Sequence, residues 1–481
     1  MPPFPRIAAL KTAALLQAYL DRSQIRLHFD ETLAAPEQSP LAAAIEVDTI
    51  RVGNRFCILP MEGWDGHEDG LPSDLTRRRW RNFGISGAKL IWGGEAVAVR
   101  HDGRASPNQL LLTPRNQGAI ASLREELVAV HRERFGPNAD ADLLIGLQLT
   151  HSGRFAKPDA KDRPAPLVGY AHPTLDRRFA NGVRILTDDE LDRLTEDFVA
   201  AARLAAGAGY RFVDVKQCHG YLGHELLGAH TRPGRYGGSI ENRTRFLRQI
   251  VESIRAAVPD LLIGVRLSVF DLVPHRKDAE GVGEPEPGAA ATDGGFGVLT
   301  GEDLDLALTE ARAVIALLER WGIRWICVTA GSPYYCPHAQ RPAFFPPMDG
   351  YQPPEDPLRG VVRQIEATAK LKAAFPAMVF VGSAYSYLQE WLPHVAQYSV
   401  RCGLTDMVGL GRMALSYPEL PADILRGAPL RRKSICRTFS DCTTGPRLGL
   451  VSGCYPLDPF YEKTPEAAQI LEVRTRMTRA N

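Results

Sequence analysis

The chain has 481 residues, of which 44% are hydrophobic and 23% are charged, so it has the composition of a globular protein long enough for one large domain or two smaller ones. Its formal net charge of +1 argues against nucleic-acid binding, which needs clustered positive charge, and no apolar run approaches the length of a membrane span. We therefore expect a soluble, cytoplasmic protein that has neither nucleic acid nor a membrane as its partner.

Residues 1–44 are expected to form a helical appendage. The spacing of apolar residues suits an amphipathic helix through about Leu20, and the segment lacks the charged region, apolar core and cleavage site of a signal peptide. Eight cysteines are scattered through the long chain. Their distribution favours reduced thiols or a metal site over a disulfide scaffold.

Short runs rich in β-branched residues recur along the chain and are predicted to be strands. They are residues 55–61, 88–99, 142–151, 211–218, 260–269, 324–331, 377–383 and 406–412. Several intervals have helical periodicity, clearest in residues 186–209, where Thr187 and Glu190 form a capping box and Gly207 can close the helix. Similar periodicity is present in residues 241–258 and 301–322.

This alternation predicts an α/β protein whose residues 45–425 form a parallel (β/α)8 TIM barrel, because strands buried on both faces read as continuously apolar. A doubly wound sheet is the rival fold. Both folds carry their chemistry at the C-terminal ends of the strands, so the polar residues that follow each run are the candidates for function.

Those strand ends, in chain order, read PM, EA, QLxHxGR, HGYL, YGGSxENRxRF, VR, VG and GR. The succession resembles the Old Yellow Enzyme family of FMN-dependent oxidoreductases over roughly residues 45–425. The segment from HGYL to YGGSxENRxRF, residues 219–246, is its most specific part, and we expect its second half to form a tight turn and a first helical turn with Glu241, Arg243 and Arg245 in local ion pairs. The lone Gly409-Leu410-Gly411 is no Rossmann fingerprint, because no GxGxxG with a later acidic residue follows.

The resemblance implies an FMN held over the mouth of the barrel. Gln148 would offer its amide to the pyrimidine edge of the flavin, and Arg266 would place a fixed cation near N1 and O2, where negative charge gathers on reduction. A phosphate would lie against backbone N–H groups of the late loops. The other cofactor-binding residues implied by the family are Pro60, Met61, Glu62 and Ala96 at the ring, and Gly382, Ser383, Gly411 and Arg412 at the phosphate.

The resemblance also assigns three catalytic residues. Tyr221 matches the proton donor, since a phenol stays protonated at neutral pH and can protonate the carbon beside the one that receives hydride. His219 matches the residue that hydrogen-bonds the substrate oxygen. Lys216 stands where the family usually has the first His of a pair, which would favour a more anionic substrate oxygen. A metal cluster of Cys218, His219, His224 and His230 lacks the spacing of a zinc site.

Glu62 is a second departure, because the family usually has Thr or Cys at this position. A carboxylate beside the flavin would lower the flavin's potential unless the carboxylate pairs with Lys216 across the ring. The alternative is that Glu62 points into a loop contact and Lys216 extends to solvent.

Residues 426–481 are expected to form a C-terminal extension. Cys436, Cys442 and Cys454 lie in a C-x5-C-x11-C array that resembles the cluster motif of the family branch containing trimethylamine dehydrogenase and 2,4-dienoyl-CoA reductase. That motif supplies four thiolates to a [4Fe–4S] centre, and its second Cys is Phe439 here. We expect a relict loop in preference to a bound iron–sulfur cluster.

Two loops are expected to shape access to the barrel mouth. Residues 275–297 are rich in Gly, Pro and Ala and are predicted to be a mobile loop that could act as a lid. Residues 331–347 contain Tyr334 and Tyr335, which would either wall the substrate site or cover the rim of the barrel.

The function implied by the resemblance is FMN-dependent reduction of an activated double bond in a small, anionic carbonyl-type substrate, with NADH or NADPH as electron donor. Within flavoenzymes the alternative is oxidation or C–N/C–O bond cleavage. From other classes, the alternatives are a flavin-free lyase in which Lys216 forms a Schiff base, and a binding protein that keeps the barrel without turnover. The sequence does not indicate the oligomeric state of the protein.

Overall fold

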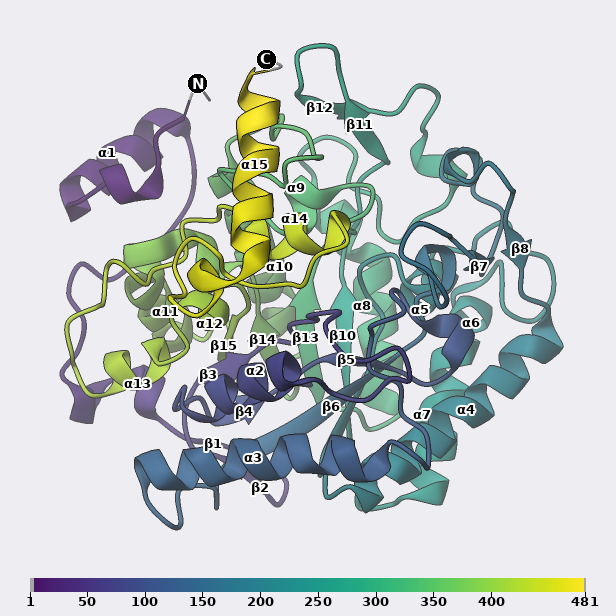
Figure 1. The fold of residues 1–481 in the computed structure, drawn as a ribbon, viewed down its shortest axis with the longest axis horizontal. Coiled ribbons are helices and arrows are strands. Elements are labelled where there is room, and N and C mark those ends of the chain that lie inside the picture. Colours follow the sequence, from purple (N-terminus) through teal and green to yellow (C-terminus); the bar gives the residue numbers. More distant parts are fainter. Residues whose placement is uncertain (1–3, 480–481) are drawn as a thin grey trace.

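The structure, a computed structural model, describes residues 4–479, so the outermost residues of the expected N-terminal appendage and C-terminal extension lie outside it. Its centre is a closed ring of parallel strands (Figure 1). In ring order these are β3 (Phe56–Ile58), β4 (Leu90–Ile91), β6 (Leu144–Thr150), β9 (Phe212–Val215), β10 (Leu262–Ser268), β13 (Trp325–Thr329), β14 (Val379–Gly382) and β15 (Met407–Leu410), and β15 pairs with β3. The prediction of a TIM barrel is confirmed, and the doubly wound sheet is wrong.

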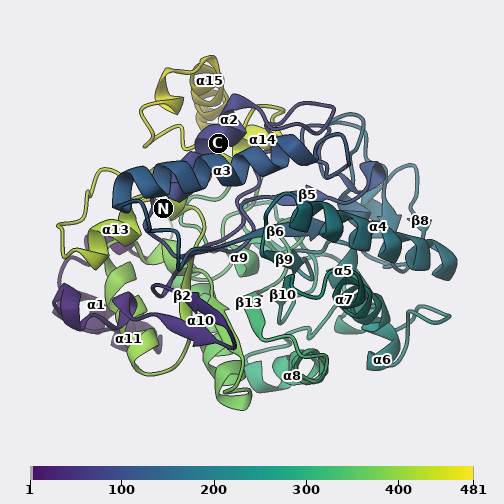
Figure 2. The same ribbon diagram turned by 90° about the horizontal axis from the view of Figure 1, so that it is seen from below.

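Helices surround the ring of strands on its outer side, as the view from below shows (Figure 2). The main helices between successive strands are α2 (Asp74–Gly84), α3 (Gln117–Phe135), α4 (Asp188–Gly207), α7 (Arg245–Ala257), α8 (Leu304–Arg320), α10 (Pro357–Ala374) and α11 (Leu392–Arg401). Shorter elements are β7 (Leu167–Val168), β8 (Arg184–Ile185), α5 (Leu222–Leu227), α6 (Ile240–Arg243), α9 (Pro337–Gln340), α12 (Met413–Ser416) and α13 (Leu420–Leu425). Within residues 4–479, no helix combines the length and apolar character that crossing a membrane requires.

The predicted strand 88–99 is two strands, because the chain breaks between β4 and β5 (Ala96–Ala98). The break falls at Gly93 and Gly94. A Cβ on Gly94, whose φ is +55°, would lie 2.2 Å from the Trp80 ring, and a Cβ on Gly93 would lie 2.8 Å from Cβ of Gln148. The backbone therefore turns where only glycine fits. Strand β5 pairs with β6 outside the closed ring.

Helix α4 begins as predicted. The Thr187 side chain accepts a hydrogen bond from the Glu190 N–H at 3.2 Å, and the Glu190 carboxylate accepts from the Thr187 N–H at 2.8 Å. This capping box satisfies two backbone N–H groups that a helix start leaves without partners. The predicted role of Gly207 is wrong: Gly207 is still helical, and Gly209, with φ of +83°, takes the left-handed conformation that ends the turn.

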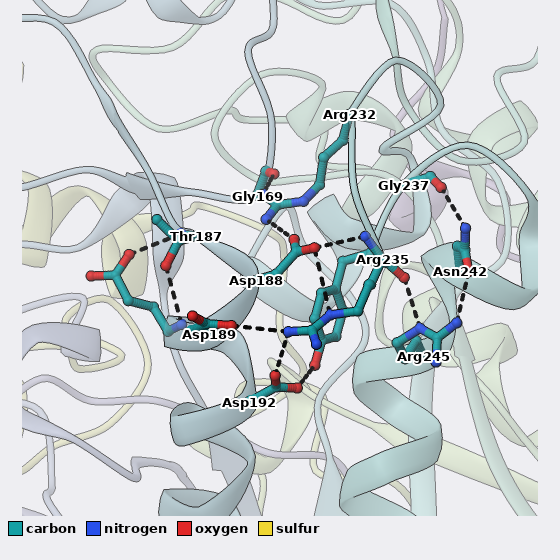
Figure 3. Close-up of polar contacts among 12 residues, drawn as sticks. Gly169, Thr187, Asp188, Asp189, Asp192, Arg232, Arg235, Gly237, Asn242 and Arg245 are labelled. Carbon is teal, nitrogen blue, oxygen red and sulfur yellow. Dashed lines mark hydrogen bonds and ion pairs between the residues drawn. The ribbon is translucent and has the colours of Figure 1, made fainter.

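The segment between α5 and α7 is anchored to the first two turns of α4 (Figure 3). Arg232 donates to Asp188 at 2.7 Å, and Arg235 donates to Asp192 at 2.6 Å, so acidic residues at a helix N-terminus hold the loop. The expected local ion pairs are wrong. Arg243 pairs with Glu310 on α8 at 2.6 Å, and Arg245 donates to the Arg235 carbonyl at 2.7 Å, because the chain folds these side chains against more distant segments.

The N-terminal helix α1 spans Ala13–Ser23, so it ends three residues beyond the predicted end at about Leu20. Thr12 caps it by accepting from the Leu15 N–H at 3.2 Å. Its Leu16 and Leu20 side chains are buried, and Trp391 donates to the Leu10 carbonyl at 2.7 Å, so the appendage packs on the barrel. The hairpin of β1 (Ile45–Val47) and β2 (Ile50–Val52) follows.

The C-terminal extension contains α14 (Asp441–Arg447) and α15 (Pro465–Arg479). Tyr455, Tyr461 and Ile470 form a small apolar cluster of their own. The predicted loop 275–297 is more regular than expected, because β11 (His275–Lys277) and β12 (Gly283–Pro285) pair as an antiparallel hairpin within it.

The barrel interior changes from apolar to polar along its axis. Successive inward positions of β9 hold Phe212 and Asp214, and Lys216 follows directly after the strand, since side chains two residues apart share one face. Asp214 lies in register with Gln148 on β6 and with Gly264 on β10. Apolar side chains fill the opposite end, among them Cys57, Leu90, Trp92, Leu144, Phe212, Trp325, Cys327, Val379 and Met407. The polar groups are thus gathered at the C-terminal end of the strands.

A buried ion cluster ties α2 to the loop after β4. Arg79 donates to Asp65 and to Glu95, both at 2.6 Å, and all three side chains are at most 5% exposed. Burial raises the pKa of Glu95 to about 7, against the opposing effect of Arg79. The guanidinium is therefore the group that makes two buried carboxylates tolerable.

We expect Arg79→Met to lower the free energy of unfolding by about 3–5 kcal/mol, because it leaves buried carboxylates without a counter-charge. Arg77→Met, two residues earlier on α2, is the matched control. Arg77 and its partner Glu126 are 32% and 33% exposed, so the loss should stay below about 1 kcal/mol. Chemical denaturation of both variants measures the difference, and equal losses would contradict the assignment.

Candidate active site

A cavity of about 830 Å³ opens at the C-terminal ends of the barrel strands. It brings together eleven of the residues that the sequence assigned to the site: Pro60, Met61, Glu62, Gln148, Lys216, His219, Tyr221, Arg266, Ser383, Gly411 and Arg412. Ala96 and Gly382, also expected there, are buried in β5 and β14 beside the cavity and do not line it. Side chains from strands far apart in the chain therefore meet at one mouth.

Asp214 organises the floor of the cavity. Its carboxylate accepts from the Gln148 amide at 2.5 Å and from the Arg266 backbone N–H at 2.7 Å. Burial raises the pKa of Asp214 to about 6. Because Asp214 takes the N–H side of the Gln148 amide, the carbonyl side of that amide is left without a partner and is free to accept a hydrogen bond from a ligand.

Six buried polar atoms of residues that line the cavity have no partner within the described residues. They are Gln148 Oε1, Arg266 Nε, Gln340 Oε1, Arg341 Nη2, Ser383 Oγ and Arg412 Nη1. Buried polar groups are normally paired, so these atoms mark where a polar ligand completes the structure. A flavin fits these groups, because its ring edge carries an N–H group and its tail is an anion. Gln148 on β6 offers an acceptor for the ring edge, and donors are offered by Arg266 on β10, Ser383 after β14 and Arg412 after β15.

The turn after β9 aims Tyr221 into the cavity. His219 and Gly220 have φ values of +68° and +76°, so two successive residues are left-handed. A Cβ on Gly220 would lie 2.8 Å from Oγ of Ser332, and that hydroxyl donates to the His219 carbonyl at 2.8 Å. Glycine is therefore required at this point of the HGYL motif, and the strained His219 is held from both sides, since its N–H donates to Ser268 at 3.1 Å.

Glu62, Lys216 and Tyr221 form one connected group. Lys216 Nζ lies 2.5 Å from Glu62 Oε1 and 3.9 Å from the centre of the Tyr221 ring. Trp64 Nε1 donates to Glu62 Oε2 at 2.9 Å, and the Tyr221 hydroxyl lies 3.4 Å from the same oxygen. The Lys216 side chain is only 1% exposed, so the alternative in which Lys216 extends to solvent is wrong. The ion pair compensates the charge that each partner brings into the cavity.

The imidazole of His219 is neutral. Loss of hydration and the nearby cations Arg266 and Lys216 lower its pKa well below the usual range. His219 Nε2 lies 3.1 Å from the Gln340 amide nitrogen and 3.4 Å from the Thr329 hydroxyl. In contrast, burial first and then the Glu62 charge raise the pKa of Tyr221, so its phenol is protonated.

The three C-terminal thiols do not fit a four-thiolate cluster. Cys436, Cys442 and Cys454 line a cavity of only about 20 Å³, and burial raises the pKa of Cys436 and of Cys454. Phe439, at the position of the missing thiolate, stacks on Phe345 with ring centroids 5.4 Å apart. Across the described part of the chain, no group of three or more Cys, His, Asp or Glu side chains is arranged to hold a metal ion.

Sequence reasoning missed three residues of the site. Asp214 lies inside an apolar strand run, where only its position two residues before Lys216 indicated an inward side chain. Trp64 lies on a loop and Gln340 ends the short helix α9, and they reach Glu62 and His219 only through the fold.

Comparisons with known proteins agree with this geometry. The sequence profile of the NADH:flavin oxidoreductase / NADH oxidase family matches residues 40–289, which is more than half of the chain, so the protein belongs to this family. Membership implies FMN as the flavin.

Similar proteins include an NADH:flavin oxidoreductase of Gibberella zeae, 29% identical over 37% of this chain and 44% of that protein. An NADPH dehydrogenase of Bacillus subtilis is 27% identical over 55% of this chain and 76% of its own length. Among solved structures, a 2-naphthoyl-CoA reductase complex has a TM-score of 0.65 at 18% identity, over 88% of this chain and 57% of that chain, which shows the shared fold. The chain thus matches only about half the length of some of its relatives.

We expect Asp214→Asn to raise the dissociation constant for FMN about tenfold, the equivalent of about 1.4 kcal/mol. The asparagine can keep its bond to Arg266, but its amide would reverse Gln148 and turn a donor toward the flavin N–H. Fluorescence titration of the apoprotein with FMN measures the constant. Gln148→Met and the double variant are the controls: if the two effects add, Asp214 does not act through Gln148.

Proposed function

We propose that the protein is an FMN-dependent oxidoreductase that takes hydride from NADH or NADPH and reduces the activated double bond of a small, anionic carbonyl-type substrate. The observation that carries this proposal is the placement of a protonated phenol, Tyr221, and a neutral imidazole, His219, in the cavity that also holds the unpaired groups of Gln148 and Arg266. A proton donor and a group for the substrate oxygen thus face the place where a flavin fits.

Each residue at the site has a separate role in the proposed reaction. Gln148 and Arg266 would hold FMN, which when bound would supply the hydride. Tyr221 protonates the carbon next to the one that receives hydride, and its raised pKa keeps that proton available at neutral pH. His219 and Lys216 face the substrate oxygen and stabilise the negative charge that develops on it. Arg266 stabilises negative charge at the flavin edge.

Charge around the cavity supports an anionic substrate. The whole chain is almost balanced, with 57 basic and 56 acidic residues, but the cavity is not. Its acidic residues are Glu62, Glu286 and Asp349. Its basic residues are Arg154, Lys157, Lys161, Arg178, Lys216, Arg266, Arg276, Lys277, Arg341, Arg412 and Arg447. Because Glu62 compensates Lys216, attraction of an anion depends on this whole set more than on Lys216 alone.

The alternatives fit less well. A cationic amine, as flavin-dependent C–N bond cleavage would require, would enter a basic cavity whose carboxylate Glu62 is already paired. A Schiff-base lyase needs a lysine with a free lone pair, and an ammonium in an ion pair has none. Lys216 is therefore a poor nucleophile as the structure holds it.

We expect the purified protein to release FMN on heat denaturation. Tyr221→Phe should leave reduction of the flavin by NAD(P)H unchanged and slow its reoxidation by an enone about 100-fold, because only the second half-reaction needs the phenolic proton. Stopped-flow absorbance in the flavin bands follows both halves. Equal losses in both would make Tyr221 structural, and release of FAD, or of no flavin, would contradict the cofactor.

We expect Glu62→Gln to tighten binding of a carboxylate-bearing ligand such as 4-hydroxybenzoate at least about tenfold, because the ammonium of Lys216 loses its counter-charge. Lys216→Met should weaken the same ligand, and neutral phenol should respond to neither change by more than about twofold. Perturbation of the flavin spectrum by each ligand gives the dissociation constants. Unchanged preference in both variants would mean that this ion pair does not contact the ligand.

A further inference from the structure

Two tyrosine hydroxyls touch at the edge of the cavity. Tyr334 belongs to the segment that follows β13, and its Oη lies 3.0 Å from Oη of Tyr221. Tyr221 is 2% exposed, whereas Tyr334 is partly exposed and lines the cavity itself. The phenol of Tyr334 therefore lies beside the proposed proton donor, and both residues line the same cavity.

The position of Tyr334 is fixed on several sides. Its ring stacks on Phe155 with centroids 4.0 Å apart and planes 8° from parallel. Its carbonyl accepts from Arg178 at 2.9 Å, and its N–H donates to the Ser332 hydroxyl at 3.2 Å. Ser332 also donates to the His219 carbonyl, so the segment that carries Tyr334 and the turn that carries Tyr221 are joined directly. The contact between the two phenols is thus built into the fold.

Besides Tyr334, the Tyr221 hydroxyl has Ser152 and Glu62 as neighbours. Glu62 is unsuited to supply a proton. Glu62 is held as a carboxylate by Lys216 at 2.5 Å and by the Trp64 N–H at 2.9 Å. A carboxylate in these contacts accepts hydrogen bonds and has no proton to give. Burial raises the pKa of the Tyr334 phenol, so this neighbour is protonated at neutral pH.

We propose that Tyr334 is a relay residue that reprotonates Tyr221 during the reductive reaction proposed above. When hydride reaches the substrate, the O–H bond of Tyr221 breaks and a C–H bond forms at the neighbouring carbon. The Tyr221 phenolate then takes the proton of Tyr334, and the Tyr334 phenolate takes a proton from water or a buffer acid. The electron pair comes from NAD(P)H through bound FMN, so the sum is one hydride and one proton added to the double bond.

The test is reoxidation of the reduced holoenzyme by an enone in stopped flow. Tyr334→Phe should slow this step roughly tenfold, less than the loss from a missing general acid, and leave flavin reduction by NAD(P)H unchanged. In a Tyr221→Phe background the same substitution should have no further effect, because a relay works only through its donor. Tyr335→Phe is the matched control: its phenol donates to Asp271 at 2.6 Å instead of to Tyr221, and its reoxidation rate should stay within about twofold.

Several results would overturn the relay. Unchanged reoxidation in Tyr334→Phe shows that Tyr221 is reprotonated without it, and equal slowing of both half-reactions shows that the ring is only structural. The relay rests on the proposed function, so a wild-type holoenzyme that no enone reoxidises overturns both, whereas normal wild-type turnover with an unaffected Tyr334→Phe overturns the relay alone.

A readout without turnover tests the contact itself. Site-specific 3-fluorotyrosine at position 334 gives one ¹⁹F resonance, which should shift when Tyr221 is replaced by Phe in the folded holoenzyme. The Tyr335→Phe background should leave it in place. If the chemical shift is the same in the Tyr221→Phe variant, the two phenols do not share a hydrogen bond, and the relay is contradicted.

Discussion

Closure of the barrel is the constraint on which the rest of this structure depends. Once the strands form a ring, every second side chain points at the axis, and the inward positions of neighbouring strands meet at the same height. Phe212 of β9 then lies in the apolar end, while Asp214 reaches Gln148 and the Arg266 backbone near the open end. One alternation along β9 thus builds both the core and the floor of the cavity.

Buried charge explains the departures from the family pattern. An ammonium at position 216 and a carboxylate at position 62 would each be costly alone in the cavity, and together they form an ion pair of 2.5 Å. Because the two charges of the pair cancel, the excess positive charge of the cavity comes from its other basic side chains. The pair also fixes the Glu62 carboxylate beside the Tyr221 hydroxyl. The two departures from the family pattern, Glu62 and Lys216, therefore depend on each other, because each charge compensates the other.

The turn that carries His219 and Tyr221 and the segment after β13 form a single unit. His219 and Gly220 adopt left-handed backbone conformations that are unfavourable for His, and Ser268 and Ser332 hold His219 there through backbone hydrogen bonds. Ser332 and Tyr334 belong to a loop more than a hundred residues away in the chain. Strain at the turn is thus balanced by contacts that fix a second phenol beside Tyr221.

The sequence by itself determined the barrel, the capping box at Thr187, and the approach of Gln148, Tyr221 and Arg266 to one mouth, because apolar periodicity and strand-end residues are local properties of the chain. It did not determine the break at Gly93 and Gly94, the pairing of Arg243 with Glu310, or the contact of Tyr334 with Tyr221. Those depend on which side chains meet across the folded barrel. Local pattern fixes the direction in which a side chain points, whereas only tertiary packing fixes its partner, and with it the charge and protonation that the site can use.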